Sequence, residues 1–188
     1  MSKETAKSGL LNGRYILSEC LFSNELGQLY HARDTRHSAG IARGANVLVH
    51  LFPGQTISYT ELANTFNRLR TMINASSYPV LPVLDYGWVD SGAYFVMANT
   101  GSWSAKVLPS LQGSPSSLHR DAMHLISQLL KEQLISRGLV PQAFLVIPGG
   151  VKILGTALTE QFQKIQLEMN LLPPAPNHKK GRKIVYTM

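Results

Sequence analysis

The sequence predicts an α+β fold, with an antiparallel sheet in its first half and helices in its second half. Short segments rich in β-branched and aromatic residues lie before residue 99, which is typical of strands. Two longer segments repeat apolar residues at helical spacing. Apolar residues make up 44% of the 188 residues, so the chain can bury a core as one domain, or as one domain plus a tail.

Five strands are expected in the first half of the chain. They are predicted at residues 14–21, 27–33, 46–52, 83–89 and 93–98. The third is almost continuously apolar, which indicates a strand covered on both faces, and Pro53 and Gly54 end it. The Asp-Ser-Gly sequence between the last two strands is a hairpin turn signal.

A helix is expected between the third and fourth strands. Ser58 and Glu61 have the S-x-x-E spacing of a capping box, in which each residue hydrogen-bonds the backbone of the other. One face of this helix is apolar and carries Leu62, Phe66, Leu69 and Ile73. This spacing predicts that the helix packs on the sheet.

The second half is expected to contain a long helix, a hairpin and a shorter helix. One face of the long helix carries Leu118, Ala122, Leu125, Ile126, Leu129, Gln133 and Leu134. Gly138 stands where a glycine would end that helix. The apolar runs "FLVI" and "VKIL" flank a Pro-Gly-Gly turn and predict the hairpin, and "TEQFQKIQLEMNLL" predicts the shorter helix.

These elements divide the chain into five parts. The expected parts are a flexible N-terminus (1–12), a sheet-rich part (13–98), a linker (99–117), a helical part (118–172) and a basic tail (173–188). Apolar runs are too short for a membrane helix, which needs about 20 residues, and the polar N-terminus lacks a signal-peptide pattern. A cytoplasmic protein that binds no membrane is therefore expected. Cys20, the lone cysteine, is expected to be buried.

The net charge of +7 is concentrated near the C-terminus. Four cations stand in the tail without an acid, and the rest of the chain carries only +3. These cations are Lys179, Lys180, Arg182 and Lys183. Such a cluster can contact nucleic-acid phosphates or an acidic protein surface, and the alternative is a solvated terminus.

The order of these phrases resembles the protein kinase family, and specifically bacterial serine/threonine kinases of the eukaryotic type. The similar phrases are "GRYILSECL…LGQLYHARD", "NVLVHLF", "FNRLRTMINASSYPVLPVLDYGWVDSGAYFVM", "LLKEQLISRGLV" and "FLVIPGGVKILG". The resemblance covers roughly residues 12–158. It implies a protein-kinase-like small lobe, with a five-stranded antiparallel sheet plus one helix, and an incomplete, truncated large lobe.

The residues that bind nucleotide in that family are replaced by other residue types in this sequence. The glycine-rich loop aligns with "FSNELG", where Phe22 and Asn24 stand at the first two glycines and only Gly27 remains. His50 aligns with the lysine of the third strand, and Leu69 aligns with the glutamate that pairs with it. Phosphoryl transfer needs a phosphate cradle and a cation, so these replacements imply that nucleotide is not bound.

The metal-binding and catalytic residues of the family are also absent. After "SRGLV" the expected H-R-D-L-K-P-x-N segment is shortened by five positions, which removes the catalytic base. Ala143 aligns with the metal-binding asparagine, and Gly155–Ala157 aligns with the D-F-G motif. The resemblance therefore implies a pseudokinase with no cofactor and no metal.

Function is expected to lie in protein binding, as an inactive scaffold or regulatory partner. The truncated large lobe would leave apolar residues such as Leu130 and Leu134 uncovered, unless the shorter C-terminal helix covers them. A homo-oligomer through that face is a further expectation. The alternative function is nucleic-acid or anionic-surface binding through the basic tail. An enzyme that reuses the cleft for other chemistry and an unrelated α+β fold also stay open.

Overall fold

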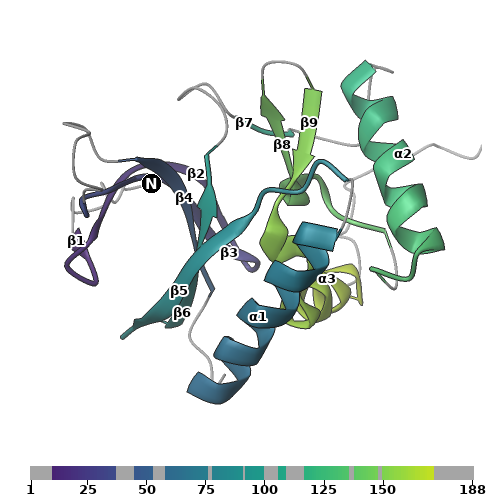
Figure 1. The fold of residues 1–188 in the computed structure, drawn as a ribbon. Helices are drawn as coiled ribbons and strands as arrows, with labels where there is room; N and C mark the ends of the chain where they lie inside the picture. Colours follow the sequence, from purple (N-terminus) through teal and green to yellow (C-terminus); the bar gives the residue numbers. More distant parts are fainter. Residues whose placement is uncertain are drawn as a thin grey trace, which may run out of the picture.

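The structure, a computed structural model, is an α+β fold in which a curled antiparallel sheet is followed by a small sheet and helices (Figure 1). It describes residues 10–36, 45–52, 58–75, 78–90, 92–99, 106–108, 117–135, 138–147 and 150–171. The order of strands and helices agrees with the order expected from the sequence. Whether this architecture is a kinase-like lobe is taken up under Proposed function.

The first sheet has six strands where five were expected. Its strands are β1 (Leu10–Leu11), β2 (Tyr15–Asn24), β3 (Gly27–Asp34), β4 (Asn46–Leu51), β5 (Val83–Val89) and β6 (Gly92–Ala98). Their order is β1-β2-β3-β4-β6-β5, and every neighbouring pair is antiparallel. The extra strand, β1, lies in the segment expected to be flexible. It pairs with β2 because Leu11 packs into the core and a turn at Asn12 and Gly13, both with positive φ, reverses the chain.

The helix expected between the third and fourth strands is α1 (Tyr59–Ala75), and it packs against β5. Its capping box is confirmed. The Ser58 backbone N–H donates to the Glu61 carboxylate at 2.9 Å, and the Glu61 N–H donates to Ser58 Oγ at 3.2 Å. Leu62 and Leu69 have no exposed surface, so the predicted apolar face is the buried face.

The second half forms a three-stranded sheet with two helices beside it. The helices are α2 (Ser117–Lys131) and α3 (Glu160–Leu171), and the strands are β7 (Lys106–Val107), β8 (Phe144–Ile147) and β9 (Gly150–Ile153). The hairpin of β8 and β9 was expected. Strand β7 was not, because it comes from the segment read as a linker and is held by only two residues paired with β8.

The end of α2 differs from the sequence prediction. The helix ends at Lys131, and Gln133, with φ of 57°, takes the left-handed position that Gly138 was expected to fill. The Leu134 N–H donates to the Leu129 carbonyl and the Gln133 N–H donates to the Leu130 carbonyl. These two bonds form a Schellman motif that uses glutamine in place of glycine.

Two apolar clusters lie on opposite faces of the six-stranded sheet. The larger joins the sheet to α1, α2, α3 and the small sheet, and includes Leu48, Phe95 and Met97. The smaller lies inside the curl and includes Tyr15 and Tyr94, and Tyr94 alternates along β6 with Phe95 and Met97 of the larger cluster. Cys20 belongs to neither cluster. It is exposed, and the prediction that it would be buried is wrong.

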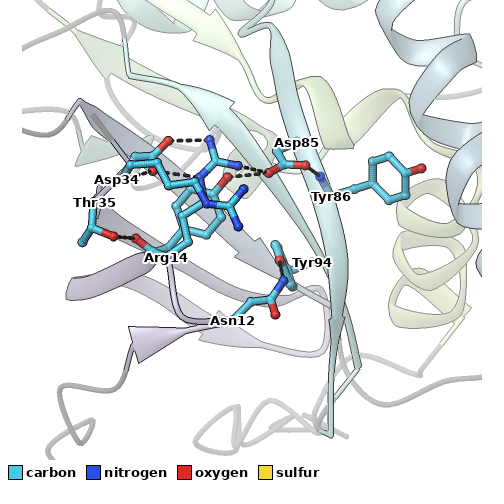
Figure 2. Close-up of polar contacts among 9 residues, drawn as sticks. Asn12, Arg14, Asp34, Thr35, Asp85, Tyr86 and Tyr94 are labelled. Atoms are coloured by element: carbon cyan, nitrogen blue, oxygen red, sulfur yellow. Dashed lines mark hydrogen bonds and ion pairs between the residues drawn. The ribbon is translucent and has the colours of Figure 1, made fainter. Parts of the chain in front are cut away.

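A charged cluster joins the two ends of the curled sheet (Figure 2). Arg14, beside β2, makes a bidentate ion pair with Asp34 at the end of β3, and its other nitrogen lies 2.6 Å from Asp85 in β5. The Tyr15 hydroxyl also donates to Asp85, at 2.6 Å. Because β2 and β5 lie near opposite ends of the strand order, these bonds hold the curl closed.

Candidate functional site

The positions that the resemblance assigns to the nucleotide cleft lie around one buried centre. Gly27 begins β3, His50 lies in β4, and Gly155 begins a short 3-10 helix at Gly155–Leu158. A Cβ on Gly27 would lie 3.2 Å from His50 Nε2, so the turn at Gly27 approaches the ring closely. Gly27 therefore lies beside His50, and Thr156, the residue after Gly155, bonds to the His50 ring although it is far away in the chain.

The turn between β2 and β3 closes the centre from one side. Asn24 Oδ1 accepts a hydrogen bond from the Leu26 N–H at 2.9 Å, which fixes a tight turn. Leu26 has no exposed surface and belongs to the main core. Gly27 has φ of 110° and a Cβ there would lie 2.1 Å from the Leu51 carbonyl oxygen, so only glycine fits. The turn that aligns with the glycine-rich loop therefore buries an apolar side chain, that of Leu26.

His50 is fully buried at the centre and joins two separate parts of the chain. Its Nδ1 lies 2.8 Å from Thr156 Oγ1, and its Nε2 lies 2.9 Å from the Leu26 carbonyl oxygen. The carbonyl can only accept, so Nε2 carries the proton. In a neutral ring Nδ1 then accepts the Thr156 hydroxyl proton, and both ring nitrogens are satisfied.

Burial lowers the pKa of His50 to about 4, because the charged ring would lose its hydration, and the bond to the Leu26 carbonyl opposes this only in part. The imidazole is therefore neutral near pH 7. A neutral ring supplies no charge to hold a phosphate group.

Aromatic side chains surround His50 and fill the remaining space. Phe52 stacks on its ring at 4.3 Å between centroids, and Phe22 and Phe162 meet it edge-on at 5.5 and 6.1 Å. Phe22 comes from β2 and Phe162 from α3, so the rings approach from opposite sides of the fold. The centre is an apolar cluster with one satisfied polar group.

The other predicted positions are also buried in the core. Leu69 and Ala143 have no exposed surface. A Cβ on Gly155 would lie 2.5 Å from the Leu81 carbonyl oxygen and 2.8 Å from Val83, so the backbone at the D-F-G position packs directly against the segment before β5. These positions now serve packing.

The segment expected to be shortened is held by Gln166 of α3. Its side-chain amide donates to the Gly138 carbonyl, and its carbonyl oxygen accepts from the Val140 N–H at 2.9 Å. Gln166 is 1% exposed, so these bonds satisfy a buried amide and two backbone groups together.

Four residues with long-range contacts were not singled out from the sequence. Leu26, Thr156 and Phe162 contact His50 through bonds or rings, and Gln166 bonds to Gly138 and Val140. Only Thr156 could have been found from the sequence, because it is the second of the three residues that align with the D-F-G motif. The other three lie in positions where a leucine, a phenylalanine or a glutamine has no special spacing.

The predicted partner-binding residues fall into two groups. Leu130 is 38% exposed on α2, and Leu134 is half-buried beyond its end. Lys179, Lys180, Arg182 and Lys183 lie outside the described residues. Within the described part of the chain, no group of three or more His, Cys, Asp or Glu side chains is placed to hold a metal ion. No described helix is long and apolar enough to cross a membrane.

Comparison with known proteins leaves the family open. No protein-family model matches the chain, and a search of curated proteins gave no match.

Proposed function

We propose that the chain is a catalytically inactive, protein-kinase-like module that works by binding another protein. The proposal is supported by the order of its elements. Apart from the two-residue strands β1 and β7, three strands, a helix, two strands, a long helix and a hairpin follow one another as the resemblance implies. It is also supported by the close approach of Gly27 to His50 and by the bond between His50 and Thr156, at positions that the resemblance assigns to one cleft.

The closed centre around His50 is the observation that carries the proposal. Nucleotide needs an open cleft, a cation beside its phosphates and acids that hold magnesium. In place of the cation stands a neutral, buried histidine, and in place of the phosphate cradle stands a turn that buries Leu26. If the chain has these elements and its cleft is filled, its outer surface is where another protein can bind.

Affinity capture with the whole chain tests the proposal. Immobilised full-length protein and a version lacking residues 177–188 are incubated with extract of the source cells, with and without nuclease and MgATP. We expect the same protein partner on both versions, unaffected by nuclease or nucleotide. Thermal unfolding is expected at the same temperature with and without MgATP, because a ligand stabilises only the state that binds it.

Two outcomes would replace this proposal. Retention that disappears with the tail or with nuclease would favour nucleic-acid binding through the basic tail, and that binding would weaken steeply with salt. A rise in unfolding temperature that saturates with MgATP, or phosphate transferred to a retained protein, would indicate an active enzyme.

A further inference from the structure

Two hollows flank a single ion pair on the face formed by α1 and α3. The first has a volume of about 300 Å³, with Phe52 and Phe95 at its base and Glu61 on its wall. The second, of about 620 Å³, is lined by the apolar side chains Met72, Leu130, Leu134, Ile135 and Leu158. Arg68 of α1 and Glu160 of α3 line both, so the hollows meet at this pair. We call the two together the α1–α3 groove.

The ion pair that crosses the groove can be broken with little loss of stability. Arg68 and Glu160 lie 2.6 Å apart, with side chains 53% and 84% exposed. Pairs as exposed as this contribute little to stability, because water screens them and the side chains lose freedom. A ligand that offers its own charge to Glu160 can therefore displace Arg68 at little cost.

The length of the groove fits a peptide segment. Its lining positions on α1 run from Glu61 to Met72, which at 1.5 Å per residue is about 16 Å. An extended chain of about five residues covers that distance. The volume of the apolar hollow exceeds what one side chain needs, so more than one apolar group of the occupant can enter it.

The charges of the groove indicate which peptide fits. Among the described lining residues, two carboxylates, Glu61 and Glu160, stand against one cation, Arg68. The described lining of the groove therefore has a net charge of −1, on a chain whose net charge is +7. Its complement is a cation next to apolar side chains, because opposite charges give specificity while apolar burial gives affinity.

We propose that the α1–α3 groove binds a short segment of a partner protein. Apolar side chains of that segment enter the hollow at Met72, Leu130 and Leu134, and an adjacent Lys or Arg side chain reaches Glu160. This inference rests on the protein-binding function proposed above and names the surface and the chemistry of the partner.

Selection from random peptides tests the groove directly. Twelve-residue peptides displayed on phage are selected on the full-length protein, and enriched peptides are labelled for fluorescence anisotropy. We expect enrichment of two apolar residues near a Lys or Arg. Leu130→Glu should weaken these peptides by tenfold or more, and Glu160→Gln should weaken them several-fold and reduce their salt dependence. Leu84→Glu, at a 52% exposed leucine of β5, is the matched control and should bind as wild type.

The experiments distinguish an error in the groove proposal from an error in the proposed function. If no peptide is enriched, or if enriched peptides bind Leu130→Glu and Glu160→Gln as tightly as wild type, the groove proposal is overturned. Capture of the partner by Leu130→Glu as efficiently as by wild type would overturn it while protein binding stands. Loss of all partner capture from the wild type would overturn the proposed function. Circular dichroism of each variant establishes that the fold is intact.

Discussion

His50 has both ring nitrogens hydrogen-bonded at a fully buried position. A lysine at this buried position would need a charged partner, and Leu69 of α1 is apolar. The neutral imidazole instead donates to the Leu26 carbonyl and accepts from Thr156, so it joins the β2–β3 turn to the segment after β9 without a buried charge. The neutral imidazole thus contributes two internal hydrogen bonds.

The buried histidine predicts a specific pH dependence of stability. The folded state resists protonation of His50 until about pH 4, whereas the unfolded chain takes up the proton near pH 6.5. Between these values the unfolded state binds more protons, so stability is full above pH 6.5 and falls as the pH is lowered. The contribution lost by pH 4 is roughly 3 kcal/mol.

Urea unfolding from pH 7.5 to pH 4.5 measures this effect. His50→Gln should be less stable than wild type at neutral pH and should have a shallower pH profile, because its side chain does not titrate. His124→Gln, which removes an exposed histidine of α2, should reproduce the wild-type profile. A His50→Gln profile as steep as that of the wild type would contradict a buried neutral ring.

At the scale of elements, the charged cluster around Arg14 keeps the sheet curled. Asp85 accepts hydrogen bonds from Arg14, from the Tyr15 hydroxyl and from the Tyr86 N–H, and so ties β2 to the last strand in the sheet (Figure 2). Burial and the bond to Asp85 raise the pKa of Tyr15, which therefore stays a donor. The Arg14 guanidinium lowers the pKa of Asp34, so that carboxylate stays charged to lower pH.

A double-mutant cycle on Tyr15 and Asp85 measures the strength of this link. Asp85→Ala leaves the buried Tyr15 hydroxyl without its acceptor, and we expect the free energy of unfolding to fall by about 1–3 kcal/mol. Tyr15→Phe should cost less, and in its presence Asp85→Ala should cost less than in the wild type. Asp90→Ala, in the β5–β6 turn, should change stability by less than about 0.5 kcal/mol. Equal effects of the two aspartate substitutions would contradict the role of the cluster.

At the scale of the whole molecule, the order of elements could be predicted because its signals are local. Helix α1 was predicted from the Ser58–Glu61 capping box and from the apolar spacing of Leu62 and Leu69. Each of these signals depends on a few neighbouring residues. The hairpin of β8 and β9 was predicted from two apolar runs and a turn. Two of the aligned positions, Gly27 and Thr156, lie against His50 in the structure.

The remaining features depend on contacts between distant residues. Strands β1 and β7 have two residues each, too few for a periodic pattern, and exist because β2 and β8 offer them an edge. The left-handed position at Gln133 could not be predicted, because glycine is the residue that usually takes this conformation at a helix end. The bonds of Gln166 to Gly138 and Val140 likewise join elements that the sequence does not pair.

A nucleotide titration followed by NMR tests the closed centre most directly. The backbone amides of Leu26, His50 and Thr156 and the ring nitrogens of His50 are recorded at pH 7 while MgATP is raised to millimolar concentration. We expect a neutral ring protonated on Nε2 and no saturable change in any of these signals. Saturable shifts centred on these three residues would instead show that the centre opens to nucleotide and is not a closed, apolar core.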